Sequence, residues 1–192
     1  MVSDSCKKRF GKIMMEEMKL VAQEEIAPRI YSMILKGEMV EQMLPGQFLH
    51  IRVPDGSKLL RRPISISEID PETQTCRLIY RIEGGGTAIF SQLPIGSKLS
   101  VMGPQGNGFD ISVVDAGQKA LLVGGGIGVP PLVETAKQLK AKGVEVVSVI
   151  GFANKDAVIL EDKLKACGDV YVTTDDGSYG IKGYVSTVID GF

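Results

Sequence analysis

The sequence contains no tryptophan and a single histidine, His50, and both absences limit the chemistry open to it. Zinc enzymes and histidine-dependent hydrolases use several imidazoles as metal ligands or bases, so neither class is favoured here. His50 lies in the stretch 47–53, where strand alternation does not settle which face it occupies. We expect a structural or surface role for it rather than a catalytic one.

Cysteine is also scarce. The three cysteines, Cys6, Cys76 and Cys167, are far apart, with no C-x-x-C pair and no metal-ligand spacing. An odd number of scattered cysteines argues against a disulfide scaffold, and a reducing cytoplasm is the simplest compartment for them. We therefore predict a cytoplasmic protein whose cysteines bind no metal.

Neither sign of charge is in excess, because 22 Lys and Arg balance 23 Asp and Glu for a formal net charge of −1. Proteins that bind nucleic acid or anionic membranes usually carry a basic excess, so neither partner is expected. No apolar run approaches the roughly 20 residues that cross a bilayer. The basic residues 7–9 are followed by 11–17 with two acids rather than by an apolar stretch, so no signal peptide is expected.

Glycine is the residue in excess, with 23 in 192 residues against about 7% in an average protein. In the first half, glycines and prolines separate short stretches rich in β-branched and aromatic residues. These predicted strands are 19–26, 30–35, 47–53, 64–69, 75–82 and 98–102. One helix is expected at 88–93, with Thr87 as its N-cap. The spacing predicts an antiparallel barrel or sandwich.

The second half changes to alternating strands and helices. Strands are predicted over 119–123, 145–150 and 169–173, and helices over 130–141, 157–165 and 184–189. The strand 119–123 is apolar without alternation, so we expect it to be buried on both faces. This order is typical of a parallel sheet with crossover helices. The boundary between the halves falls in the polar segment 115–118.

A glycine loop, Gly124-Gly125-Gly126-Ile127-Gly128, joins the first strand of the second half to its helix. Glycine permits positive φ and lets a phosphate approach backbone N–H groups where a helix begins. The loop is neither a G-x-G-x-x-G motif nor a Walker loop, and no acidic residue closes the next strand. Nucleotide binding is the favoured interpretation, and a tight turn without a ligand is the alternative.

Three further places have both a ligand-binding and an ordinary structural interpretation. Arg62 and Ser65 could bind a phosphate or simply begin an exposed basic strand. The segment 84–87 precedes a helix, where an anion site and a plain N-cap turn are both consistent with it. The segment 173–178 follows a strand of the parallel sheet, where ligands bind, but Asp-Gly is also a common turn dipeptide.

Five motifs occur in one order along the chain. They are Arg62-Pro63-Ile64-Ser65, Leu78-Ile79-Tyr80-Arg81, Gly84-Gly85-Gly86-Thr87, 103–109 and 123–131, with 174–180 and 182–183 further on. Together they resemble the ferredoxin–NADP reductase superfamily, and most closely the electron-transfer subunits of class 1B dihydroorotate dehydrogenase. The resemblance implies a Greek-key antiparallel β-barrel over 18–115, after an N-terminal extension over 1–17. A partial doubly wound parallel α/β domain over 118–192 would follow.

The same resemblance implies which residues bind cofactors. For FAD they are Arg62, Pro63, Ile64, Ser65, Ile79, Tyr80, Arg81, Gly86 and Thr87. Ser65 would lie near the flavin N5, Ile64 against the flavin ring, and residues 86–87 at the diphosphate. For NAD(H) they are Gly124, Gly125, Gly126, Ile127, Gly128, Asp175 and Asp176. No side chain is expected to act as a general acid or base, because the flavin carries the chemistry.

The implied function is that of an FAD-dependent electron-transfer subunit in pyrimidine biosynthesis. It would pass electrons between NAD(H) and an FMN-containing partner subunit that oxidises dihydroorotate. A stand-alone NAD(P)H-dependent flavin reductase is an alternative that partner-free diaphorase activity would favour. A cofactor-free binding protein is the second alternative, which the absence of colour and of FAD uptake by the purified protein would favour.

The chain also departs from the family that it resembles. Members of the dihydroorotate type carry a [2Fe–2S] cluster on four closely spaced cysteines near the C-terminus, and no cysteine follows Cys167 here. Since the last predicted helix should lead to another strand, we expect the chain to be a fragment of a longer subunit. A sheet of order 3-2-1-4-5 would then lack strands 4 and 5. The strand 119–123 would be an exposed apolar edge, which favours self-association.

Overall fold

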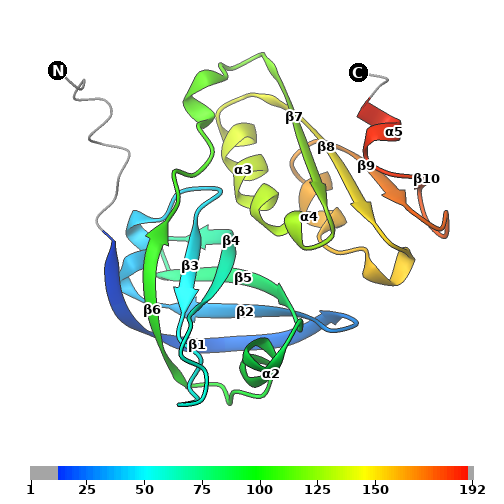
Figure 1. Cartoon of the computed structure of the whole chain (residues 1–192). Helices are drawn as coiled ribbons and strands as arrows, with labels where there is room; N and C mark the ends of the chain where they lie inside the picture. Colours follow the sequence, from blue (N-terminus) through cyan, green and yellow to red (C-terminus); the bar gives the residue numbers. More distant parts are fainter. Residues whose placement is uncertain (1–12, 190–192) are drawn as a thin grey trace. The chain divides into compact units, whose positions relative to one another are not determined.

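The computed structural model describes residues 13–189 and divides the chain into two compact units. The barrel unit comprises the residues up to Glu25 together with Ile30–Phe109, and the α/β unit comprises Ile26–Arg29 and the residues from Asp110 onward. Figure 1 shows a barrel of strands in the first unit and a sheet flanked by helices in the second. Each unit is described separately below.

The barrel unit is a closed six-stranded antiparallel barrel with the strand order β1-β2-β5-β4-β3-β6. Its strands are β1 (Met14–Ala27), β2 (Ile30–Lys36), β3 (Phe48–Ile51), β4 (Arg62–Asp70), β5 (Thr75–Arg81) and β6 (Lys98–Gln105). Pairing of β1 with β6 closes the barrel, so every strand has two neighbours. The predicted Greek-key barrel is confirmed.

Two short helices complete the barrel unit. The 3-10 helix η1 (Glu38–Gln42) follows β2, and α2 (Gly85–Ser91) lies between β5 and β6. The carboxylate of Glu16 accepts hydrogen bonds from the backbone N–H groups of Glu38 and Met39, at 2.7 and 2.8 Å, and so caps η1. Glu16 belongs to β1, which therefore begins inside the segment that we assigned to an N-terminal extension.

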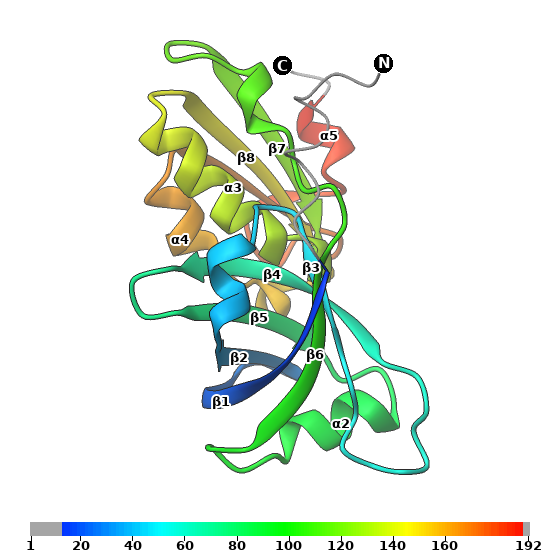
Figure 2. The ribbon, with the colours of Figure 1, turned by 90° about the vertical axis from the view of Figure 1, so that its left-hand side faces the viewer.

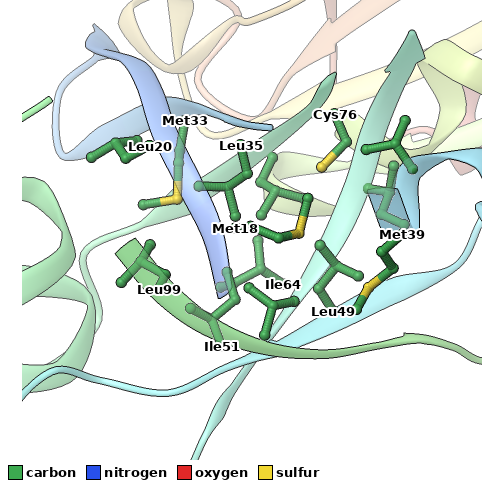
Figure 3. Packing of buried hydrophobic residues seen from close by; sticks show 14 of the residues in the cluster. Met18, Leu20, Met33, Leu35, Met39, Leu49, Ile51, Ile64, Cys76 and Leu99 are labelled. Carbon is green, nitrogen blue, oxygen red and sulfur yellow. The ribbon is translucent and has the colours of Figure 1, made fainter. Parts of the chain in front are cut away.

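The core of the barrel is formed by buried apolar side chains that pack together inside it (Figure 3). Strand β5 shows the alternation of a strand clearly, because Cys76, Leu78 and Tyr80 belong to this core whereas Arg77 and Arg81 do not. The largest fully buried side chains include Met18, Leu20, Met33, Leu35, Met39, Leu49, Ile51, Ile66, Leu78, Phe90 and Leu99. Apolar packing of this kind is the main source of stability of such a barrel.

The α/β unit is a four-stranded parallel sheet with the order β10-β9-β8-β7. The strands are β7 (Lys119–Gly125), β8 (Glu145–Phe152), β9 (Asp169–Thr174) and β10 (Ile181–Lys182). The helices are α3 (Pro130–Ala141), α4 (Glu161–Lys165) and α5 (Ser186–Ile189), and the 3-10 turns are η2 (Ile111–Val113), η3 (Gly126–Gly128) and η4 (Lys155–Ala157). Figure 2 shows α3 and α4 on one face of the sheet and α5 on the other. The predicted parallel α/β architecture is confirmed.

Strand β7 corrects one expectation, because it is not buried on both faces. It lies at one end of the sheet and, among the described residues, pairs only with β8. A Cβ on Gly124 would lie 2.8 Å from Leu132 of α3, so this face of the strand meets a helix. Leu121 and Val123 point to the other face and remain 38% and 39% exposed. The prediction that this strand forms an apolar edge is confirmed, whereas the prediction that it is buried on both faces was wrong.

Two expected helix boundaries also differ in the structure. Helix α2 begins at Gly85, with Gly84 as its N-cap, and Thr87 lies within its first turn instead of capping it. The helix predicted over 157–165 is split into η4 and α4, because Leu160 takes a left-handed conformation with φ of 63°. The β-branched residues Val158 and Ile159 lie in this break, which fits their lower helix propensity. Within residues 13–189, no helix is long and apolar enough to cross a membrane.

Candidate cofactor and nucleotide sites

The motif Arg62-Pro63-Ile64-Ser65 begins β4 of the barrel unit, and its residues alternate between two environments. Ile64 is 9% exposed and packs into the core. Arg62 is half-buried and, two positions before Ile64, points to the same face of β4. Ser65 is half-buried on the opposite face, in register with Phe48 of β3. Arg62 and Ser65 are therefore both partly accessible to a ligand, but from different faces of β4.

The glycine segment 84–86 forms a cradle next to Arg62. A Cβ on Gly86 would lie 2.6 Å from Nε of Arg62, so the absence of a side chain lets the guanidinium approach the backbone. Arg62 is oriented by its Nη1, which donates to the carbonyl oxygen of Leu60 at 2.8 Å. The structure thus brings together two residues, Arg62 and Gly86, that are 24 positions apart in the sequence. A guanidinium beside the N–H groups of a first helical turn is suited to bind a phosphate.

Thr87 shapes this cradle through its side-chain hydroxyl, which bonds to the backbone just before the helix. Its Oγ1 accepts hydrogen bonds from the N–H groups of Glu83 and Gly84, at 3.0 and 3.3 Å, and donates to the carbonyl oxygen of Gly84 at 3.1 Å. The N–H groups of a first helical turn have no partner within the helix, so those of α2 can serve a ligand. In the structure Thr87 orders the turn that presents them.

The three residues 79–81 of β5 differ strongly in exposure. Ile79 and Tyr80 are both 2% exposed, whereas Arg81 lies at the surface and pairs with Glu83. Tyr80 Oη donates to Oε1 of Gln23 at 3.1 Å, and the ring stacks on Tyr31 at 5.9 Å between centroids. Burial raises the pKa of the Tyr80 hydroxyl well above its ordinary value, with a smaller contribution from Tyr31. Tyr80 therefore stays protonated.

His50 is held by neighbours within the barrel. Its Nδ1 lies 3.2 Å from Nε2 of Gln105, and its ring packs against Phe48 with centroids 5.3 Å apart. Its carbonyl oxygen also accepts from Nη1 of Arg61 at 3.4 Å. These contacts fit the structural role that we expected for it.

The loop after β7 presents an open glycine surface in the α/β unit. Gly126 has φ of 50°, and a Cβ on Gly126 or Gly128 would meet no atom within 4 Å. Ile127, between them, is 36% exposed. Gly124, in contrast, is needed for packing, since its Cβ would lie 3.1 Å from the carbonyl oxygen of Gly128. The open glycines and the start of α3 leave room for a phosphate at the carboxyl end of the sheet.

The loop after β9 is bonded to the loop after β8. The N–H groups of Asp175 and Asp176 donate to the carbonyl oxygens of Phe152 and Ala153, at 3.0 and 3.3 Å. Ser178 Oγ accepts from the N–H of Lys155 at 2.8 Å. Hydrogen bonds from the side chain and backbone of Ser178 lower the pKa of the Asp176 carboxyl below its ordinary value. The structure thus places a charged loop at the carboxyl ends of two adjacent strands.

No metal centre is evident in the part of the chain that the structure describes. No group of three or more His, Cys, Asp or Glu residues within 13–189 could hold a metal ion. Cys76 lies in the barrel unit and Cys167 in the α/β unit, and both thiols are buried. Cys6 lies outside the described residues. These described residues do not fit a [2Fe–2S] cluster.

Comparison with solved structures supports the architecture. A structure reported as "Insights into flavin-based electron bifurcation via the NADH-dependent reduced ferredoxin-NADP oxidoreductase structure" matches with a TM-score of 0.82 and 28% identity over 92% of this chain and 63% of that chain. A ferredoxin NADP+ reductase from Neisseria gonorrhoeae with bound FAD and NADP matches with a TM-score of 0.77 over 92% of this chain and 76% of that chain. Its identity of 14% supports the fold alone.

Comparison of sequences identifies the family. Residues 17–109 match the family model described as an oxidoreductase FAD-binding domain. The chain is 74% identical over 180 residues to a "Dihydroorotate dehydrogenase B (NAD(+)), electron transfer subunit" of Streptococcus thermophilus, covering 94% of this chain and 70% of that protein. A protein of the same name from Streptococcus mutans is 69% identical over 178 residues, covering 93% of this chain and 69% of that protein. The chain belongs to the family of dihydroorotate dehydrogenase B electron transfer subunits.

Proposed function

We propose that this chain binds FAD in its barrel unit and NAD(H) in its α/β unit. In this role it passes electrons between NAD(H) and a partner dehydrogenase of the dihydroorotate type. The observation that carries the proposal is the cradle of Arg62 and Gly86, which lies in a barrel that matches an FAD-binding domain. The names of the relatives at 74% and 69% identity support the electron-transfer role over a stand-alone flavin reductase.

The residues of the barrel fit FAD in three places. The guanidinium of Arg62 and the N–H groups of residues 86–87 would bind the diphosphate, which carries negative charge. Ser65, with the backbone of Pro63 and Ile64, would line the flavin ring. Ile79, Tyr80 and Arg81 would form the neighbouring wall, where the buried Tyr80 contributes shape and no charge at neutral pH. When bound, FAD supplies the change from two-electron to one-electron transfer.

NAD(H) would lie at the carboxyl end of the parallel sheet. Gly124, Gly125, Gly126, Ile127 and Gly128 would present backbone N–H groups to its diphosphate. Asp175 and Asp176, which follow β9, would face the remainder of the nucleotide. The hydrogen bonds between the loops after β8 and β9 hold the backbone of these two residues in place.

The partner in this proposal is an FMN-containing dehydrogenase subunit of pyrimidine biosynthesis. The relatives are named as electron transfer subunits, and a subunit that only transfers electrons requires another protein to accept or donate them. Two buried cysteine thiols are consistent with the reducing cytoplasm that we infer as the compartment.

The visible absorption spectrum of the purified chain tests the proposal. We expect flavin bands, and FAD should be the flavin released on denaturation. Anaerobic addition of NADH should then bleach the bands. A colourless protein that takes up no added FAD would overturn the assignment. Rapid turnover with artificial acceptors in the absence of any partner would favour the stand-alone reductase.

A further inference from the structure

The loop between β3 and β4 brings a lysine to the glycine segment of the barrel unit. A Cβ on Gly85 would lie 3.3 Å from Cε and 3.4 Å from Nζ of Lys58. The ammonium group of Lys58 therefore lies against the backbone of Gly85. Glycine permits this approach, since even a methyl group would be in tight contact with the lysine.

A hydrogen-bonded turn positions the backbone of Lys58. The carboxylate of Asp55 accepts a hydrogen bond from the N–H of Ser57 at 2.8 Å, and the N–H of Lys58 donates to the carbonyl oxygen of Asp55 at 3.0 Å. Bonds from Ser57 lower the pKa of the Asp55 carboxyl, and the charge of Lys58 is the smallest of the causes. The carboxylate thus serves the turn and does not form a close ion pair with the lysine.

Arg62 approaches the next residue of the same segment. Its Nε lies 2.6 Å from the Cβ position of Gly86, so two cationic side chains converge on adjacent glycines. Among the described residues, neither Lys58 nor Arg62 forms an ion pair with a carboxylate. Two like charges brought to one backbone segment repel each other, and a bound anion would convert this cost into attraction.

We propose that Lys58 is a further residue of the FAD site, whose ammonium binds the cofactor diphosphate together with Arg62. This inference rests on the proposed function, because it takes FAD as the ligand of the barrel. A diphosphate has enough oxygen acceptors for both side chains, and ionised groups form the stronger hydrogen bonds. Lys58 is thus the third contributor to the diphosphate site, beside Arg62 and the glycine backbone.

The test compares FAD binding by the 192-residue apoprotein, two charge-matched variants and the conservative variant Lys58→Arg. Lys58→Gln removes the proposed contact. Lys36→Gln removes a barrel lysine at the far end of the β2–β5 pair, where Lys36 is in register with Thr75. Quenching of flavin fluorescence gives the Kd for FAD and for riboflavin, which has no phosphate. Thermal unfolding of each variant checks the fold.

We expect Lys58→Gln to weaken FAD binding about tenfold, the typical value of one hydrogen bond to a charged group. Lys36→Gln should bind FAD like the wild type, Lys58→Arg should keep most of the affinity, and riboflavin binding should be equal in all four proteins. Added salt should reduce the difference between Lys58→Gln and the wild type, because screening weakens the lost contact.

Two outcomes would overturn the inference alone. One is equal FAD affinity of Lys58→Gln and Lys36→Gln in a wild-type protein that binds FAD. The other is an equal loss of FAD and riboflavin affinity in Lys58→Gln, which would place the effect away from the diphosphate. A wild-type protein that binds neither flavin would instead overturn the proposed function, and this inference with it.

Discussion

The two units differ in whether their sheets have unpaired edge strands. In the barrel unit each of the six strands pairs on both sides, so the backbone hydrogen bonds close on themselves. In the α/β unit, β7 pairs on one side only among the described residues. A closed barrel has no strand open to addition, whereas an edge strand offers free N–H and C=O groups. The strand pairing of the barrel unit is therefore closed, whereas the sheet of the α/β unit has an edge at which another strand could pair.

The same contrast appears in side-chain packing. Leu78 of β5 is fully buried within the barrel core, whereas Leu121 of β7 is 38% exposed. Both are leucines in the middle of a strand, and their sequences alone suggest equal burial. What differs is how completely other side chains cover the face to which each leucine points.

The largest expected effect tests this contrast directly. Leu78→Ala should destabilise the protein by about 2–5 kcal/mol, because it leaves a cavity in a closed core. Leu121→Ala should cost about 1 kcal/mol or less, since the side chain is already partly in water. Urea unfolding followed by circular dichroism measures both. Equal losses would mean that β7 is as well packed as the barrel.

Two neighbouring arginines provide the next comparison. Arg62→Ala should weaken FAD binding about 10- to 100-fold through loss of a charge-assisted contact, with NAD(H) binding unchanged. Arg61 instead donates to the carbonyl oxygen and Oγ of Ser100, at 2.6 and 3.0 Å. Arg61→Ala should therefore lower stability by about 1–2 kcal/mol and leave FAD affinity near that of the wild type. Flavin titration and thermal unfolding distinguish the two, and a reversed pattern would reject the assigned roles.

The open edge leads to a smaller, concentration-dependent effect. If β7 mediates self-association, the sedimentation coefficient should rise with protein concentration, and Leu121→Lys should suppress the rise, because edge lysines oppose strand addition. Lys119→Arg, on the same strand, serves as the control, because it changes an edge residue and keeps its positive charge. A wild type that stays monomeric at every concentration would contradict this role of the edge.

The smallest expected effect concerns the loop after β9. The folded-state pKa of Asp176 lies below the ordinary value of 3.8, so the carboxylate contributes stability that is fully present above that value. The contribution is lost as the pH falls through the folded-state pKa. Asp176→Asn should therefore lower the unfolding temperature slightly at neutral pH, and the difference should vanish in acid. A difference that persists at the lowest pH would assign the effect to another group.

The sequence predicted the architecture well where local signals agree with the fold. The helix Pro130–Ala141 has its predicted bounds, because a proline pair begins it and Gly143 follows its end. Thr87 was assigned as an N-cap, but the glycines at 84–86 allow the helix to begin earlier. The hydroxyl of Thr87 therefore bonds to the backbone of Glu83 and Gly84. Burial of the strand 119–123 depends on which layers cover it, and an apolar run does not contain that information.

The candidate sites were predictable as motifs but not as contacts. Arg62 and Gly86 were each identified, yet only the fold brings the guanidinium against the glycine. Lys58 was overlooked, because a lysine after a Pro-Asp-Gly turn has no signature of its own. The turn chemistry of Asp55 and Ser57 was readable from the sequence, and it marks the place where Lys58 would be held.

Among residues 13–189, each unit contains one buried thiol, and this provides a built-in reporter of local opening. Cys76 is 1% exposed in the barrel, where burial raises its thiol pKa to about 12, and Cys167 is 8% exposed in the α/β unit. An alkylating reagent reacts with the thiolate, so each cysteine is protected until its own unit opens. Mass spectrometry of the two labelled peptides along a denaturant series would therefore yield separate unfolding curves for the two halves of one unmodified chain. It would show, without any introduced probe, whether the barrel unit unfolds at a higher denaturant concentration than the α/β unit.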